Sequence, residues 1–230
     1  MPLTGVCSMA SRQILTALAE QWCTLGGQPL SLIAAGWVDV AKRIRAGEEF
    51  DLVFLANEAL VSLQDEGFVL ARSLRPLMRS GIALAVRQGD ALPDISSEQA
   101  LRSTVLSAPS IGYSTGPSGS ALLALFERWG VVDTLKDRLV QAPAGVPVGQ
   151  LVAQGQVAIG FQQRSELMGL AGITLVASLP DTVQIDTVFS GAIARSCRDV
   201  ERQAQATAVL EFMASAKAGP VITHYGMTPV

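Results

Sequence analysis

The sequence predicts an α/β protein with two lobes, each built on a mainly parallel sheet. Short apolar runs alternate with amphipathic helical patterns along the 230 residues, which is typical of strand–helix units. This alternation occurs in two series, linked by long apolar runs at 79–86 and 185–194. We therefore place one lobe at residues 1–82 with 190–230 and the other at 83–189. Two crossover strands would join the Rossmann-like lobes, with a ligand cleft between them.

The first series contains three strand–helix units. The expected strands are 3–7, 30–33 and 51–55, and the expected helices are 11–22, 38–46 and a helix capped by Asn57. Ligands of such sheets bind beyond the carboxyl ends of the strands. This rule points to Ser8, to Gly36 with Trp37, and to Asn57.

The second series repeats the pattern. The expected strands are 110–115, 139–140, 157–161 and 173–177, and the expected helical segments begin at Ser118, Val148 and Ser165. The strand pattern at 185–194 leads back to the first lobe. An amphipathic helix at 200–214 and the tail at 221–227 are expected to pack there.

The segment 111–120, Ile-Gly-Tyr-Ser-Thr-Gly-Pro-Ser-Gly-Ser, is a strand that ends in a turn rich in glycine and hydroxyls and leads into a helix. Gly116 and Gly119 allow a tight turn and a close approach of the backbone to a ligand. Thr115 and Ser118 supply hydroxyls beside the unpaired N–H groups of a helix start, which can hold an oxyanion or carboxylate. An ordinary capped turn is the alternative interpretation.

Composition excludes several classes of partner and cofactor. A net charge of −3 leaves no basic face for nucleic acid. Three cysteines without a CxxC pair and a single histidine argue against a metal site, and no cofactor is expected. The chain is expected to be cytoplasmic as it stands, or periplasmic if a leader has been removed. We expect a monomer with a small anionic ligand.

In the order of its elements, the chain resembles the molybdate-binding, type II branch of the periplasmic solute-binding proteins. The resemblance rests on the strand that leads into Ser8-Met9, on the run 51–57, Asp-Leu-Val-Phe-Leu-Ala-Asn, and on the strand that ends at Phe161-Gln162. It implies lobes that close on an anion held by hydroxyls and N–H groups. It also implies an ABC-transporter permease as partner if the protein is secreted.

By this resemblance, the ligand-binding positions are Ser8, Met9, Gly36, Trp37, Val148, Gln162 and Gln163. Gly36-Trp37 stands where the family often has a serine, and Gln162 or Gln163 where molybdate binders commonly have a tyrosine. Both differences favour an anion other than molybdate. Arg79 is a further candidate, as a bidentate clamp for a carboxylate.

Three segments resemble a branch of molybdate-binder-like proteins that includes aconitate isomerase. They are Ser-Thr-Gly-Pro-Ser-Gly at 114–119, Gly-Phe-Gln-Gln-Arg-Ser-Glu-Leu at 160–167 and Ser-Leu-Pro at 178–180. The implied alternative function is a cofactor-independent isomerase of an unsaturated tricarboxylate. Such a reaction needs a proton-transferring group. Glu166, Cys7 and His224 are each conceivable, so the catalytic residue stays open and binding is the first interpretation.

A regulatory ligand-sensing domain is a third interpretation. It is weakened because the chain contains no helix pair of the kind that binds DNA.

Overall fold

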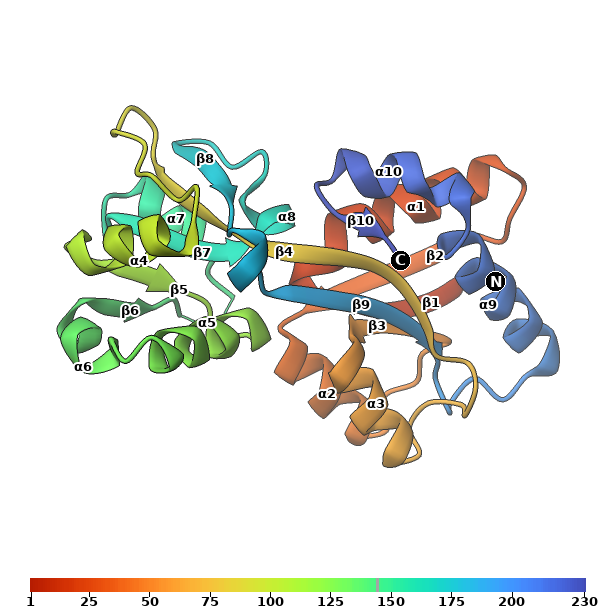
Figure 1. The fold of residues 1–230 in the computed structure, drawn as a ribbon. Coiled ribbons are helices and arrows are strands. Elements are labelled where there is room, and N and C mark those ends of the chain that lie inside the picture. The colour runs from red at the N-terminus through yellow and green to blue at the C-terminus, as the bar shows by residue number, and fades with distance from the viewer. Residues whose placement is uncertain (144) are drawn as a thin grey trace. The chain divides into compact units, whose positions relative to one another are not determined.

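The computed structural model describes residues 1–143 and 145–230 and consists of two compact α/β units (Figure 1). Unit 1 comprises Met1–Arg79 and Val188–Val230, and unit 2 comprises Ser80–Thr187. The chain passes from one unit to the other within strand β4 (Arg75–Arg87) and returns within strand β9 (Asp186–Ile193). The predicted fold class is therefore confirmed. The divisions predicted at 82/83 and 189/190 fall in the same two strands, slightly further along the chain.

Unit 1 is a sheet covered by helices on both faces. The strand order is β2-β1-β3-β9-β4, with β10 paired to β4; β1, β2 and β3 are parallel, and β9 is antiparallel to β3. The strands not yet defined are β1 (Leu3–Ser8), β2 (Leu30–Ala35), β3 (Leu52–Ala56) and β10 (Thr228–Pro229). The helices are η1 (Met9–Ser11), α1 (Arg12–Thr24), α2 (Trp37–Arg45), α3 (Asn57–Asp65), α9 (Val200–Met213), η4 (Ala216–Ala218) and α10 (Gly219–His224).

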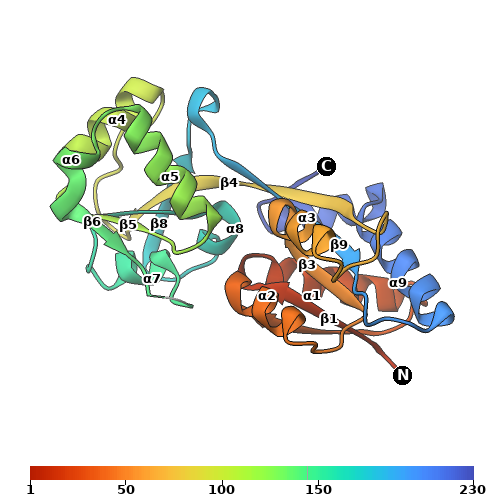
Figure 2. The same cartoon turned by 90° about the horizontal axis from the view of Figure 1, so that it is seen from below.

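Alternation along the strands of unit 1 determines which helices cover which face. In β3, Leu52 and Phe54 pack in a cluster with α1, α9 and α10. Val53 and Leu55 pack in a second cluster with α2 and α3. Successive side chains of a strand point to opposite faces, so a fully buried strand needs helices on both. Figure 2 shows unit 1 from a second direction, with α2 and α3 together beside β3.

Unit 2 has its own sheet, in the order β4-β7-β5-β6, with β8 also paired to β4. Strand β5 is parallel to β6 and β7, whereas β4 is antiparallel to β7 and β8. The strands are β5 (Ile111–Tyr113), β6 (Leu139–Gln141), β7 (Ile159–Gln163) and β8 (Ile173–Ser178). The helices are α4 (Glu98–Ser107), α5 (Pro117–Arg128), α6 (Val132–Leu135), η2 (Lys136–Arg138), α7 (Val148–Ala153), α8 (Arg164–Leu167) and η3 (Asp181–Val183).

One local prediction is wrong. Asn57 does not cap α3; Ala56 is the N-cap residue, and Asn57 is the first residue of the helix. Gln162 and Gln163 are the last two residues of β7, at the strand end where the sequence places them. Helix α10 begins at a Gly-Pro pair, a sequence that usually interrupts a helix. Proline is tolerated in the first turn of a helix, because its missing N–H would have had no partner there.

A buried carboxylate ties the start of unit 1 to helix α9. Asp51 is 5% exposed and accepts hydrogen bonds from the Thr4 backbone N–H (2.7 Å) and hydroxyl (3.0 Å). The guanidinium of Arg202 donates to both Asp51 oxygens. Burial raises the pKa of Asp51, but the hydrogen bonds from Arg202 and Thr4 outweigh it and lower the pKa to about 2.

We expect Asp51→Asn to lower the free energy of unfolding at pH 7 by about 2–4 kcal/mol, because Arg202 loses its buried partner. The folded-state pKa lies below the ordinary 3.8, so the carboxylate contributes stability above about pH 4 and loses it as the pH falls towards about 2. Urea unfolding from pH 7 to pH 2.5 should show the difference between wild type and variant shrinking. Asp65→Asn, at an exposed position, is the matched control and should change stability by no more than about 0.5 kcal/mol.

Candidate functional site

The carboxyl ends of the parallel strands of unit 1 each lead directly into a helix. In register, Ser8 lies beside Ala35, and Cys7 beside Phe54, so the three strand ends are neighbours. The N-cap residues of η1, α2 and α3 are Ser8, Gly36 and Ala56. None of the three makes a side-chain cap hydrogen bond. First-turn N–H groups of these helices are therefore available to an external acceptor.

Ser8 contributes a buried hydroxyl at this edge. The residue is only 6% exposed, and its Oγ lies 3.2 Å from Ser11 Oγ. The Ser11 hydroxyl donates to the Ser8 carbonyl at 3.3 Å. Both distances are long for hydroxyl hydrogen bonds, which centre on about 2.7–2.8 Å. The Ser8 hydrogen can therefore turn to a ligand oxygen at little cost.

Two large apolar side chains stand at the same strand ends. Met9 is the first residue after β1 and is 43% exposed; Trp37 is the first residue of α2 and is 38% exposed. Exposed apolar groups beside a polar edge are typical of sites that contact the carbon skeleton of a ligand. Gly36 leaves little room there, since a Cβ at this position would lie 3.2 Å from Asp39 Oδ2.

Ser190 is a polar residue of this region that the sequence analysis missed. It is fully buried in β9, and its hydroxyl donates to Asn57 Oδ1 at 2.8 Å. The bond orients the Asn57 side chain at the start of α3. A serine inside an otherwise apolar strand pattern was the available signal.

The glycine-rich segment of unit 2 forms the turn between β5 and α5. Gly116 is the N-cap residue and makes no side-chain cap; Pro117 follows at the first helical position. Ser118 is 6% exposed, and its Oγ lies 3.0 Å from Ser114 Oγ. Thr115 is exposed in the turn. This arrangement gives α5, a helix of 12 residues, an open N-terminus with hydroxyls beside it.

Gly119 brings helix α5 onto the end of β5. A Cβ at this position would lie 1.9 Å from the Ser114 carbonyl oxygen, a backbone atom that cannot turn aside. Only glycine allows this approach of helix to strand end. The predicted close approach of Gly119 to a ligand stays a prediction.

Gln162 and Val148, both predicted to contact a ligand, are bonded to each other. The Gln162 Oε1 accepts from the backbone N–H of Val148 (2.8 Å) and, more weakly, from that of Gly149 (3.4 Å). Gln162 is 4% exposed. The side chain therefore caps α7 from the neighbouring strand β7.

Gln163 has one end of its amide bonded and the other without a partner. Its Nε2 donates to Thr187 Oγ1 at 2.6 Å, and the residue is 3% exposed. Its Oε1 is buried and has no hydrogen-bond partner in the described part of the chain. A buried polar atom of this kind calls for an explanation, and an absent ligand group is one.

The remaining predicted ligand residue, Arg79, lies within a strand and not at a strand end. It is exposed in the middle of β4, opposite Thr228 of β10. It is the last residue of unit 1 before the chain enters unit 2.

The three conceivable acid–base residues differ sharply in environment. Burial raises the pKa of the Cys7 thiol to about 12, so it is protonated at neutral pH. His224 is exposed at the end of α10, edge-on to the Tyr225 ring. Burial raises the pKa of Glu166 to about 7, against the lowering effect of a hydrogen bond from Gln162. Glu166 therefore titrates near neutral pH, unlike the Cys7 thiol.

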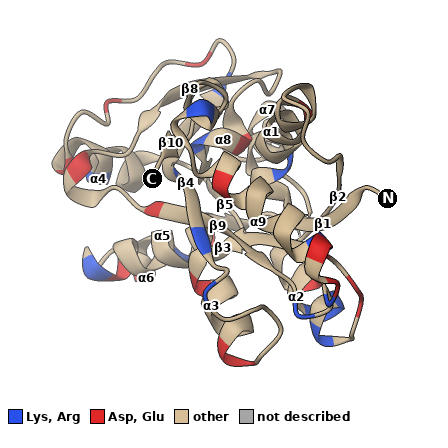
Figure 3. Cartoon of the chain, turned by 90° about the vertical axis from the view of Figure 1, so that its right-hand side faces the viewer, with Lys and Arg blue, Asp and Glu red and all other residues tan. Residues whose placement is uncertain are grey.

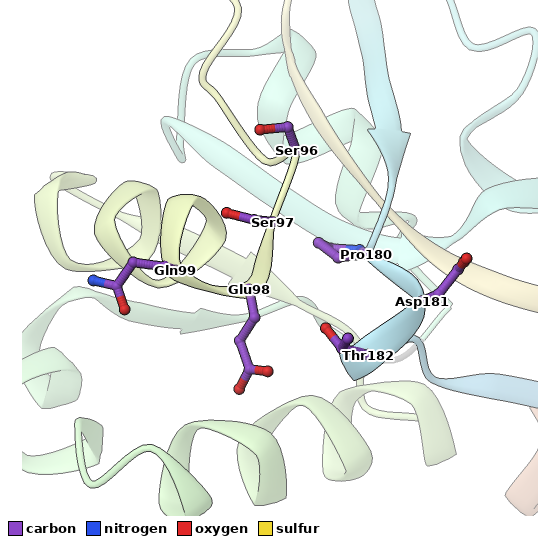
Figure 4. A pocket seen from close by; sticks show the side chains of 7 residues that line it. All are labelled: Ser96, Ser97, Glu98, Gln99, Pro180, Asp181 and Thr182. Carbon is purple, nitrogen blue, oxygen red and sulfur yellow. The ribbon is translucent and has the colours of Figure 1, made fainter.

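A separate hollow of about 590 Å³ lies in unit 2 between the start of α4 and the turn after β8 (Figure 4). It is lined by Ser96, Ser97, Glu98, Gln99, Pro180, Asp181 and Thr182. No residue of the predicted site is among them. The Glu98 carboxylate already accepts a hydrogen bond from Trp129 Nε1 at 2.7 Å.

Charged residues of both signs are interspersed over the chain in Figure 3. The basic residues of α2 are engaged locally: Arg43 pairs with Glu48 at 2.5 Å and Arg45 with Glu66 at 2.6 Å. Within residues 1–143 and 145–230, no group of His, Cys, Asp and Glu is placed to hold a metal ion. In the same residues, no helix has both the length and the apolar character needed to cross a bilayer.

Comparison with known proteins identifies relatives of this chain. A family model described as bacterial extracellular solute-binding protein matches residues 3–228. Aconitate isomerase from a Pseudomonas species is 37% identical over 192 residues, which are 83% of this chain and 72% of that protein. These matches confirm the resemblance predicted from the sequence.

Solved structures of similar fold cover nearly the whole chain. The periplasmic molybdate-binding protein of Azotobacter vinelandii has a TM-score of 0.79 at 21% identity, over 98% of each chain. Iron-bound HitA from Pseudomonas aeruginosa has a TM-score of 0.72 at 15% identity, over 99% of this chain and 86% of that one. At such identities these similarities concern the fold alone.

We expect Gly119→Ala to destabilise the protein by about 1–3 kcal/mol, because the new methyl group forces α5 away from the Ser114 carbonyl. Thermal unfolding is the measurement. Gly219→Ala is the matched control, since a Cβ there would meet nothing closer than 3.7 Å. Equal melting temperatures for the two variants would contradict the tight contact at Gly119.

Proposed function

The chain belongs to the family of bacterial extracellular solute-binding proteins, and from this premise we propose that it binds a small organic anion. Backbone N–H groups and hydroxyls at the carboxyl ends of the parallel strands hold the anion. The candidate groups are Ser8 and Gly36 within unit 1, and Thr115, Gly116 and Ser118 within unit 2.

One observation carries this proposal: helices α2, α3 and α5 begin at or just after strand ends, where sheets of this kind bind ligands, and their N-cap residues offer no side-chain acceptor. Helices α4 and α9 show the alternative, a helix start satisfied by its own side chain. Ser97 caps α4 by accepting from Ala100 N at 3.2 Å, and Asp199 caps α9 by accepting from Arg202 N at 2.8 Å. No such bond is made by the N-cap residues of α2, α3 and α5. An anionic oxygen supplies the acceptor that these helix starts lack.

Two further features favour an organic anion over a bare inorganic oxyanion. The exposed Met9 and Trp37 side chains offer apolar contact area, which a tetrahedral oxyanion cannot use. The unpartnered Oε1 of Gln163 is an acceptor, so it suits a ligand that carries a hydroxyl or a protonated carboxyl.

Isomerisation of an unsaturated tricarboxylate is the second candidate function. It is favoured by the relative named aconitate isomerase, which is 37% identical over 83% of this chain. A site that binds carboxylates through N–H groups is compatible with either binding or turnover. The reaction that we propose needs no cofactor, since it moves only a proton and a double bond.

For the binding function, we propose a monomer that is periplasmic when exported and delivers its ligand to an ABC-transporter permease. The family description, with its extracellular location, supports this. For the isomerase function, no protein partner is needed, and a cytoplasmic location is equally compatible.

We expect Ser118→Ala and Ser8→Ala each to weaken binding of trans-aconitate by about tenfold or more, because each removes a hydrogen bond to a charged oxygen. Isothermal titration calorimetry measures the affinity, and thermal unfolding checks that each variant is folded. Ser103→Ala, at an exposed position on α4, is the control and should bind like wild type. If one serine variant binds normally, that serine contributes no hydrogen bond to the ligand.

A ligand panel tests the class of anion. We expect trans-aconitate and related tricarboxylates to raise the melting temperature by several degrees, since a ligand that binds only the folded state stabilises it by mass action. Molybdate at the same concentration should leave it unchanged. A larger shift with molybdate would contradict the preference for an organic anion.

A further inference from the structure

Glu166 is a carboxyl group at the same strand end as the predicted ligand residues of β7. It lies in the first turn of α8, directly after Gln163 and Arg164, and is half-buried. In the described part of the chain it forms no ion pair; the Arg164 guanidinium on the same helix instead donates to Ser178 Oγ at 3.5 Å. The neighbouring elements α7 and β8 contain no charged residue. A half-buried acid without a counter-charge is costly unless the group has a function.

Gln162 lies beside this carboxyl and points its donor end towards it. Its Oε1 accepts from Val148 N and Gly149 N, so its Nε2 is the end that can donate. The interaction of Gln162 with Glu166 lowers the pKa of the carboxyl, against the effect of burial. Gly149 holds α7 close to the segment after β7, since a Cβ there would lie 2.7 Å from Leu170 Cδ1. The segment that carries the carboxyl is thus packed between strand β7 and helix α7.

We propose that Glu166 is the acid–base group that carries the proton in the isomerisation of an unsaturated tricarboxylate, an inference that rests on the second proposed function. The Glu166 carboxylate takes a proton from the CH₂ carbon between a carboxylate and the double bond. The electron pair of that C–H bond forms a new C=C bond, and the old π pair moves to the far carbon. That carbon takes the proton back from the Glu166 carboxylic acid.

This sequence of steps balances without any other reactant. One C–H bond breaks and one forms, the double bond moves by one position, and its geometry is set anew when the proton returns. Negative charge that develops on the carboxylate oxygens of the substrate is stabilised by N–H groups such as those at the start of α5. A single carboxyl serves first as base and then as acid, which explains why the sequence shows no acid–base pair.

The environment of Glu166 suits this role. A pKa near 7 leaves comparable amounts of acid and base at neutral pH, the condition in which one group does both steps well. The other candidates differ in environment: burial keeps the Cys7 thiol protonated, with a pKa of about 12, and His224 is exposed at the end of α10.

The test uses the full chain, with cis- and trans-aconitate as probes and proton NMR to follow the vinyl signals. We expect wild type to interconvert the isomers and Glu166→Gln to lower kcat at pH 8 by about 100-fold or more. Affinity measured by calorimetry at pH 6, where Glu166 is largely protonated in wild type, should agree within about threefold between the two. Glu166→Asp should retain more activity than Glu166→Gln. Glu127→Gln, at an exposed position in α5, is the matched control and should match wild type.

The pH profile gives an independent readout. The base form of Glu166 starts the reaction, so kcat/KM of wild type should fall as the pH drops below about 7. If Glu166→Gln does not fold, the test is the fall of kcat/KM at acid pH in wild type and a shift of its midpoint in Glu166→Asp. A kcat/KM that stays constant between pH 5 and pH 8 would overturn the proposal.

The two levels of the proposal fail differently. Turnover by Glu166→Gln within about fivefold of wild type would overturn the role of Glu166 and leave the isomerase function standing. Binding without turnover in wild type would remove the isomerase function and the role of Glu166 together. Absence of binding would remove the tricarboxylate itself.

Discussion

Every helix begins with backbone N–H groups that have no acceptor within the helix, and this constraint organises the functional part of the molecule. Away from the strand ends, Ser97 and Asp199 satisfy it with their own side chains. At the strand ends, Gly36, Ala56 and Gly116 provide no acceptor at all. The starts of α2, α3 and α5 therefore lack a side-chain acceptor at the edge where such sheets bind ligands, which suits them to an anion.

Gln162 is the point where binding geometry and acid–base chemistry meet. An amide side chain has one acceptor and one donor end, and here each end has a defined partner. The acceptor end supplies the cap that α7 lacks, and the donor end lowers the pKa of Glu166. Replacing Gln162 with glutamate would remove the donor, and replacing it with leucine would remove donor and acceptor together. The same side chain therefore determines both the position of α7 and the environment of the carboxyl.

The fold was largely predictable because periodicity reports which side chains are buried. Fully apolar strands such as Leu52–Ala56 require helices on both faces, and the two series of such strands gave the two units. Helix α4 escaped prediction, since only Leu101 and Val105 are buried in its 10 residues. The candidate site was only partly predictable. Ser118 and Gly119 stood out through the turn chemistry, but the bond between Gln162 and Val148 joins residues 14 apart, and no local pattern shows it.

The connection of the two units through β4 and β9 determines the order in which the parts of each unit leave the ribosome. All strands of the unit 2 sheet come from one continuous stretch, residues 80–187, so this unit can complete its hydrogen bonding as soon as that stretch emerges. Unit 1 cannot, because its main cluster combines Leu3 and Leu15 with Leu210 and Ile222. Its first segment must remain incomplete through most of synthesis, with Phe54 exposed to water or to a chaperone. The inserted unit therefore has its whole sequence available before the other unit does, although the other unit begins the chain.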